Sequence, residues 1–152
     1  RDIWEGGHRV PFIVRWPGKV PAGRVDAQSV LSGADWLPTL CAITGVTFNA
    51  ADFDGENVSA ALLGGIHVRT QPLFWKVNSE KSDPTLRWQN WKLHVPHRAR
   101  GEVELYDLST DPGESHNLAP QKPDLVQELT TRLKAWTDTL PTAYEHGDVK
   151  EN

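Results

Sequence analysis

The sequence predicts an α/β chain in two parts: a strand, turn and helix, then a small antiparallel sheet packed by a C-terminal helix. Two observations predict this architecture. An apolar run rich in β-branched residues and a capped helical pattern occupy residues 11–45. Short β-prone segments and one long amphipathic segment follow after residue 70. A helix beside a run of short strands is typical of domains that mix α and β layers.

The first part begins with the turn Glu5-Gly6-Gly7-His8-Arg9-Val10-Pro11, whose adjacent glycines allow left-handed backbone or a close approach to a neighbour. Its proline favours extended geometry in the residue before it. The apolar run Pro11–Trp16 predicts a buried strand, which the turn signal Pro17-Gly18 ends. Within the turn, Glu5 and Arg9 either form a buried ion pair or reach the rim of an active site.

A helix follows this strand in the prediction. A second turn, Pro21-Ala22-Gly23, and a short strand over Gln28–Ser32 lead into it. Asp35 suits the N-cap, and Pro38 suits the first turn, where its missing N–H costs little. Gly45 suits the position just past the C-terminus, where the backbone turns left-handed.

The second part is predicted to be a four-stranded antiparallel sheet. A connector over Asn49–Gly65, with a short helical candidate at Asn57–Leu63, precedes it. Gln89-Asn90 predicts a tight turn between the second and third strands. The four β-prone segments are Pro72–Asn78, Thr85–Trp88, Trp91–Val95 and Val103–Leu108.

The last element is an amphipathic helix that starts at Pro123 and ends by Pro141. Its apolar residues recur at helical spacing, which predicts one face packed on the sheet. They are Leu125, Val126, Leu129, Leu133, Trp136 and Leu140.

Composition excludes several classes of partner. The net charge is −4, so no basic surface favours DNA or RNA, and no apolar run is long enough for a transmembrane helix. The seven scattered tryptophans favour packing in a core, with sugar stacking as the functional alternative. Cys41 is predicted to be a core thiol.

Because the chain starts at Arg1 and contains no Met, we expect a fragment of a longer protein.

Three motifs stand in order along the chain. They are the Glu5–Pro11 turn with Arg15-Trp16-Pro17-Gly18, then Asp35-Trp36-Leu37-Pro38-Thr39-Leu40, then Leu105–Glu114 with Asn117-Leu118-Ala119. Together they resemble the C-terminal region of a sulfatase of the alkaline-phosphatase superfamily, of the arylsulfatase and N-acetylgalactosamine-6-sulfatase kind. Taken structurally, Asp111-Pro112-Gly113-Glu114 predicts a turn in which the glycine takes the left-handed region.

The resemblance implies a sulfuric ester hydrolase. Residues 1–65 would be the C-terminal part of its α/β catalytic domain, at the end of a large mixed sheet, and residues 66–152 a small C-terminal subdomain. The family uses a formylglycine nucleophile and a calcium ion on a sulfated glycan or small molecule, and the resemblance implies a periplasmic, secreted or lysosomal location. The partner of this chain would be the remainder of the catalytic domain.

The catalytic machinery of that family is not found in this sequence. Formylglycine is made within a Cys/Ser-x-Pro-x-Arg motif, and Cys41 is followed by neither the proline nor the arginine. We therefore expect no catalytic residue, no metal ligand and no bound cofactor in this chain, and we expect it to be inactive alone.

Substrate recognition is the role left open to this chain. The loop His94–Arg100 concentrates cationic groups that suit an anionic sulfated sugar, so the candidate substrate-binding residues are His97, Arg98 and Arg100. A solvated basic loop is the structural alternative. Two other functions stay open: a phosphate or phosphonate ester hydrolase of the same superfamily, and a non-enzymatic carbohydrate-binding module with exposed tryptophans in a line on one face.

Overall fold

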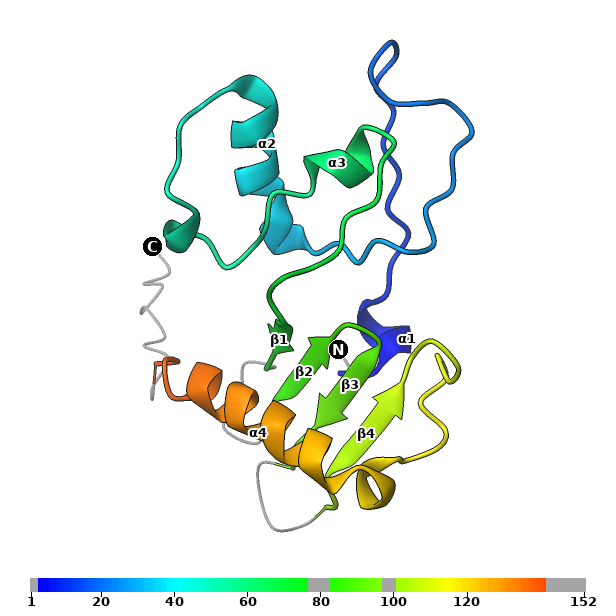
Figure 1. Ribbon diagram of the computed structural model, residues 1–152, viewed down its shortest axis with the longest axis vertical. Helices are drawn as coiled ribbons and strands as arrows, with labels where there is room; N and C mark the ends of the chain where they lie inside the picture. The colour runs from blue at the N-terminus through cyan, green and yellow to red at the C-terminus, as the bar shows by residue number, and fades with distance from the viewer. Residues whose placement is uncertain (1–2, 77–82, 97–100, 142–152) are drawn as a thin grey trace, which may run out of the picture. The chain divides into compact units, whose positions relative to one another are not determined.

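The computed structural model describes residues 3–76, 83–96 and 101–141, and the chain divides into two compact units (Figure 1). Unit 1 comprises residues 1–5 and 74–152, and unit 2 comprises residues 6–73. Unit 1 is therefore assembled from both ends of the chain. The domain ranges 1–65 and 66–152, which follow from the resemblance, stay a prediction.

Unit 1 is built on a four-stranded sheet with the strand order β1-β2-β3-β4. The strands are Leu73–Trp75, Thr85–Trp88, Trp91–His94 and Glu104–Asp107. β3 pairs antiparallel with both β2 and β4. Between β2 and β3, Gln89-Asn90 forms a two-residue turn with Gln89 in the left-handed region at φ 54°, as tight hairpins favour. The predicted sheet and its hairpin are confirmed.

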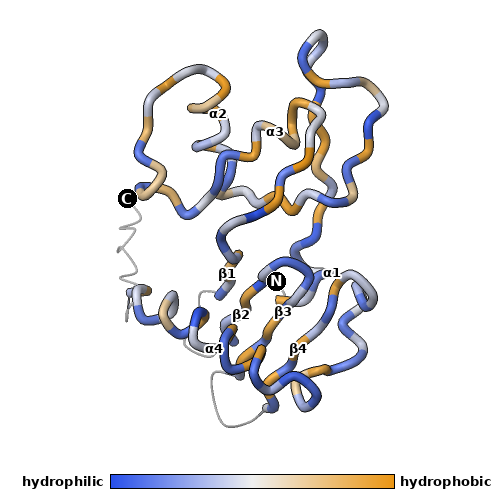
Figure 2. Tube along the Cα trace, in the orientation of Figure 1, coloured by the Kyte–Doolittle hydropathy of each residue, from blue (hydrophilic) through white to orange (hydrophobic). Residues whose placement is uncertain are grey.

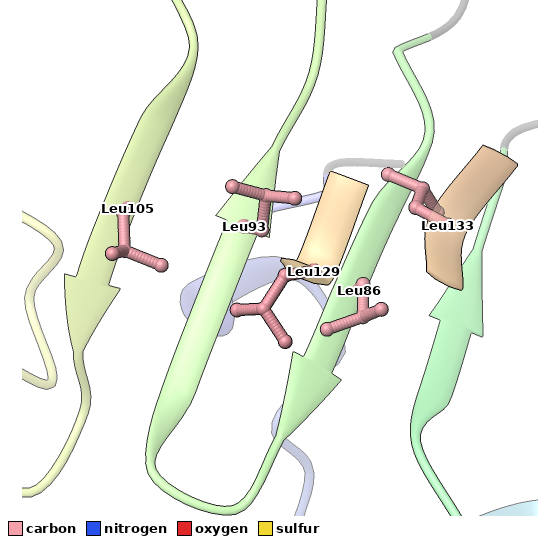
Figure 3. Close-up of a cluster of buried hydrophobic side chains, with 5 residues drawn as sticks. All are labelled: Leu86, Leu93, Leu105, Leu129 and Leu133. Carbon is pink, nitrogen blue, oxygen red and sulfur yellow. The ribbon is translucent and has the colours of Figure 1, made fainter. Parts of the chain in front are cut away.

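The core of unit 1 lies between the sheet and helix α4 (Pro123–Thr137). Leu86, Leu93 and Leu105 stand opposite one another on β2, β3 and β4, and Leu129 and Leu133 of α4 pack on them (Figure 3). Each is at most 2% exposed, so each contributes about 1.5–3 kcal/mol by burial. The tryptophans packed against this cluster are Trp88, Trp91 and Trp136.

Helix α4 confirms the amphipathic pattern of the sequence. It begins at Pro123, as predicted, and ends at Thr137, before Pro141. Its leucines face the sheet, and its outer surface carries the exposed ion pairs Glu128–Arg132 and Lys134–Asp138. Hydrophobic and hydrophilic residues also alternate along the strands beneath it (Figure 2).

Unit 2 contains the short helices α2 (Trp36–Thr44) and α3 (Ser59–Leu62), which confirms the two predicted helical segments. The segment that joins them includes a 3₁₀ turn over Ala50–Asp52. Gly45 follows α2 in the left-handed conformation, at φ 75°. Asp35 directly precedes α2 but makes no capping bond to it. Instead Ser32 caps a 3₁₀ turn over Gly33–Asp35 in a capping box with Asp35, so the helical region starts earlier than predicted.

The two strands predicted in the first part are absent. Residues 11–16 and residues 28–32 are in no strand, and Phe12 and Ile13 are 44% and 89% exposed. The prediction of a buried strand at residues 11–16 is wrong: the apolar pattern favours a strand, but a strand needs a neighbour for its backbone N–H and C=O groups. Within the described residues of unit 2 no strand offers that pairing.

The leucine core predicts a large effect of one substitution. Leu129→Ala should lower the free energy of unfolding by about 2–5 kcal/mol, because it removes a fully buried side chain and leaves a cavity. Gln127→Ala on the exposed side of α4 is the control, with an effect within about 0.5 kcal/mol. Urea unfolding followed by circular dichroism measures both, and equal effects of the two variants would contradict this packing.

Candidate functional site

The face of the sheet opposite the leucines is charged. Side chains alternate between the two faces of a strand, so the neighbours of Leu86, Leu93 and Leu105 lie on this second face. We call it the charged face; it comprises Thr85, Arg87, Lys92, His94, Glu104 and Tyr106. Thr85 is opposite His94, and Lys92 is opposite Arg87 on one side and Tyr106 on the other. Most of these side chains are buried, including Lys92, which is fully buried.

Lys92 lies between two buried carboxylates. Its Nζ is 3.3 Å from Oε1 of Glu5 and 2.9 Å from Oε1 of Glu114, and these carboxylate side chains are 5% and 3% exposed. Glu5 and Glu114 are 109 positions apart in the sequence. One ammonium group thus brings together the start of the chain and the loop after β4.

Glu114 accepts hydrogen bonds from several directions. Its Oε1 also lies 3.0 Å from Nε2 of His94, and its Oε2 accepts from the backbone N–H of Glu5 at 2.6 Å. Because a carboxylate only accepts, Nε2 of His94 carries a proton, and in the neutral ring Nδ1 accepts from the Thr85 hydroxyl at 3.0 Å. The turn motif predicts the left-handed conformation for Gly113. In the structure the neighbouring Glu114 adopts it instead, at φ 54°.

The start of the chain is docked on the charged face. The ring of Trp4 lies 4.5 Å from the ring of His94 and 6.0 Å from that of Tyr106. Glu5 pairs with Lys92 and also with Arg87, whose Nη1 is 3.4 Å away. The suggested ion pair of Glu5 with its near neighbour Arg9 is therefore wrong. Arg9 is exposed, while cations of the sheet surround the buried carboxylate.

The protonation of these groups follows from their surroundings. Burial opposes the charge on Glu114, but the hydrogen bonds from Lys92, the Glu5 N–H and His94 outweigh it and hold the pKa of Glu114 below its ordinary value. Burial raises the pKa of Glu104, and it raises that of Tyr106 to about 12. Glu114 is thus an ionised carboxylate already engaged by protein donors. This arrangement is suited to holding chain segments in place.

A second buried carboxylate organises unit 2. Asp35 is 1% exposed and accepts from the backbone N–H groups of Ser32 and Glu56, at 2.6 and 2.9 Å. Arg69 binds it with two nitrogens, Nη1 at 2.7 Å and Nη2 at 3.2 Å. The neighbouring loop can approach only because residue 55 is glycine. A Cβ there would lie 2.1 Å from the carbonyl oxygen of Ala34.

Glu56 fixes the following loop in the same way. Its Oε1 accepts from the backbone N–H groups of Thr70 and Gln71, at 2.8 and 2.7 Å, and its Oε2 lies 2.8 Å from Nε2 of His67. Burial opposes its charge, but the hydrogen bonds of Thr70 and His67 and the charge of Arg69 lower the pKa of Glu56 below its ordinary value. Asp35 and Glu56 therefore serve the fold of unit 2.

The buried carboxylates of Glu5 and Glu114 are engaged by a protein cation. No group of three or more His, Cys, Asp or Glu side chains in the described ranges is arranged to hold a metal ion. Calcium prefers several oxygen ligands, whereas the carboxylates of Glu5 and Glu114 are bound by Lys92. That the calcium ligands of the family lie in other parts of the protein stays a prediction.

The predicted substrate-binding residues His97, Arg98 and Arg100 lie outside the described residues. Their role is therefore untested. Of the same loop, His94 belongs to the charged face. Sequence reasoning missed the pairing of Lys92 with its carboxylates. The signal was the alternation of polar residues with leucines in β2 and β3, which indicates a sheet with two different faces.

Two tryptophans of unit 2 are open to solvent. Trp16 and Trp36 are 40% and 42% exposed, whereas the three tryptophans around the leucine core are partly buried.

None of the helices among residues 3–76, 83–96 and 101–141 has the length and apolar character that crossing a bilayer requires.

The Lys92 site predicts a contrast between buried and exposed ion pairs. Lys92→Met should lower the free energy of unfolding by about 3–5 kcal/mol, because it removes the ammonium group that lies between two buried carboxylates. Lys134→Met removes the partner of exposed Asp138 and should cost at most about 1 kcal/mol. Urea denaturation of both variants measures the difference, and comparable midpoints would refute the burial of a charged pair.

The pH dependence of stability should report on Glu114. Its pKa lies below the ordinary value of 4.5 in the folded chain, so the unfolded chain binds more protons, and stability falls as the pH drops through the folded pKa. Glu114→Gln removes this contribution, so its unfolding free energy should change less between about pH 6 and about pH 3. Urea unfolding at each pH measures the slopes. Parallel slopes for both proteins would argue against an ionised Glu114.

Comparisons with known proteins place the chain in a family. The sequence profile of the family described as "N-sulphoglucosamine sulphohydrolase, C-terminal" matches residues 1–139. Arylsulfatase G of Rattus norvegicus is 42% identical over 158 residues, covering 92% of this chain and 30% of the relative. N-acetylgalactosamine-6-O-sulfatase of Bacteroides thetaiotaomicron is 30% identical over 151 residues, covering 88% and 28%. The chain thus spans less than a third of these relatives.

Solved structures share the fold. A structure from work on the metabolism of multiple glycosaminoglycans by Bacteroides thetaiotaomicron has a TM-score of 0.71 and 28% identity, over 88% of this chain and 30% of that chain. A protein solved in complex with its substrate D-glucosamine-2-N,6-O-disulfate has a TM-score of 0.51 and 24% identity, over 70% of this chain and 24% of that chain. With the family profile covering nearly all the described residues, the chain belongs to the sulfatases, as a C-terminal region of the N-sulphoglucosamine sulphohydrolase type.

Proposed function

We propose that this chain is the C-terminal part of an enzyme that hydrolyses sulfate esters of sulfated carbohydrates. The observation that carries the proposal is the match of the family profile across residues 1–139. The names of the relatives support the sugar substrate, since one is an N-acetylgalactosamine-6-O-sulfatase. The neighbour with a disulfated glucosamine points in the same direction.

Completing the fold of the catalytic domain is the first role that we propose for the chain. Unit 2 exposes many large apolar side chains, and soluble monomers rarely leave such surface uncovered. They are Val10, Phe12, Ile13, Trp16, Val25, Trp36, Leu37, Leu40, Val46, Leu63, Ile66 and Val68. The remainder of the catalytic domain would cover them. Residues 11–16, which are β-prone and belong to no strand of this chain, would then pair as a strand of its large mixed sheet.

The reactive groups would come from that remainder. The enzyme would use a formylglycine nucleophile and a calcium ion that polarises the sulfate group, neither of them held by this chain. Its location would be periplasmic, secreted or lysosomal. The second role of the chain would be to shape the substrate pocket through the loop that contains His97, Arg98 and Arg100.

Expression of the complete gene product beside the 152-residue chain tests this proposal. Both are assayed with an aryl sulfate, with sulfated amino sugars and with the matching phosphate esters. The complete protein should cleave the sulfate esters, and the chain alone should cleave none. Faster cleavage of the phosphate esters would favour the other hydrolase class. Sulfatase activity of the chain alone would contradict the division of roles, and glycan binding without hydrolysis by the complete protein would favour a binding module.

The cationic loop gives a kinetic prediction. Arg100→Ala in the complete enzyme should raise KM for a sulfated sugar by about tenfold or more, because it removes a charge-assisted hydrogen bond worth about 1.5–3 kcal/mol. Arg132→Ala on the exposed face of α4 is the matched control and should leave KM unchanged. Steady-state kinetics on several sulfated substrates measure the effect, and an unaltered KM on all of them would remove the loop from the substrate site.

A further inference from the structure

The geometry points to Lys92 and Glu114 as positioning residues that hold the Trp4–Glu5 main chain in the place that sulfate ester hydrolysis requires. This inference rests on the proposed function and adds to it. It assigns a role in the reaction to Lys92 of the charged face and to Glu114 of the loop that follows β4. Neither belongs to the cationic loop.

The contacts of the charged face converge on Glu5. Glu114 accepts from its backbone N–H at 2.6 Å, and Lys92 and Arg87 pair with its carboxylate at 3.3 and 3.4 Å. The preceding ring, Trp4, packs beside His94 and Tyr106. A hydrogen bond to the main chain, together with side-chain contacts on two successive residues, fixes both the position and the direction of the backbone at this point.

Stability alone is a poor reason for this arrangement. Each buried ion loses several kcal/mol of hydration, and apolar replacements of whole buried ion clusters are often neutral or stabilising. The opposite face of the same sheet is filled with leucines, so burial of this sheet does not require charge. Glu114 adds a further cost of about 1–2 kcal/mol by taking the left-handed conformation at φ 54°. The buried charges and the left-handed conformation of Glu114 both cost stability. These costs indicate that the pairing of Lys92 with Glu5 and Glu114 serves to position the Trp4–Glu5 main chain.

The segment after Glu5 depends on this anchor. Glu5 begins the single helical turn α1 (Glu5–His8), and Gly6 and Gly7 follow it. A Cβ at Gly6 would meet nothing within 4 Å, so no packing at that position orients the turn. The adjacent glycines Gly6 and Gly7 also allow the backbone to adopt several other conformations. The contacts of Glu5 therefore fix the first residue of the Glu5–Pro11 motif. A reacting group of the enzyme that is placed through this turn would lose on the order of 100-fold in rate if it were displaced by about 1 Å.

The test separates placement from stability in the complete gene product. Lys92→Met is compared with the triple variant Glu5→Gln, Lys92→Met, Glu114→Gln, in which the charges of the ammonium and of its two carboxylates are removed together. The exposed pair Lys134→Met, Asp138→Asn is the matched control. The urea midpoint and kcat/KM per folded molecule on a sulfate ester are measured for each.

The single variant should lose both stability and activity. The triple variant should regain the urea midpoint of the unchanged protein, because no buried charge is left without a partner among the three. Its kcat/KM should stay about tenfold or more below that of the unchanged protein, because the main chain is no longer held. Recovery of activity together with stability would overturn the inference, since a merely structural cluster predicts that result.

A second variant keeps the test decisive if the triple variant does not fold. Glu114→Gln is nearly isosteric, and it should speed amide hydrogen exchange in residues 3–8 by about tenfold without changing exchange in α4. Unchanged exchange in residues 3–8, or equal acceleration in α4, would overturn the inference. An unchanged protein that cleaves no sulfate ester would contradict the proposed function, while the exchange measurement would still decide whether Glu114 holds the turn.

Discussion

The pairing of Lys92 with Glu5 and Glu114 is the interaction on which unit 1 depends. It joins residues that are 109 positions apart and attaches the start of the chain to the sheet. Without it the charged face of β2, β3 and β4 would be buried with its charges unbalanced. The opposite face needs no such balance, because leucines from the sheet and from α4 fill it. One sheet thus combines an apolar core on one face with a polar layer on the other, and the polar layer contacts the start of the chain.

Buried carboxylates organise both units by the same physical means. Asp35 gathers the backbone of Ser32 and Glu56 and the side chain of Arg69, as Glu114 gathers Glu5, Lys92 and His94. A carboxylate has several acceptor positions and can therefore fix chain segments that form no regular structure. This explains how loops and single turns hold a defined course in a chain with few long elements.

Local elements were predictable from the sequence, and long-range partners were not. β2, its hairpin turn and the start of α4 follow from residue patterns within a few positions of each other. The partner of Glu5 was not predictable, because the nearest cation in sequence, Arg9, is exposed and the true partners lie on strands more than 80 residues away. The strand expected at residues 11–16 failed for a related reason, since its pattern is local while its pairing would require other chain segments.

The central claim is that this chain is one part of a larger sulfatase fold, with the Glu5 turn held by the charged face. An experimental structure of the complete gene product tests it most directly. In that structure Lys92 Nζ should lie within ion-pair distance of both carboxylates, and residues 11–16 should be paired within a large sheet. An exposed, unpaired segment 11–16, or a Lys92 that contacts neither Glu5 nor Glu114, would contradict it.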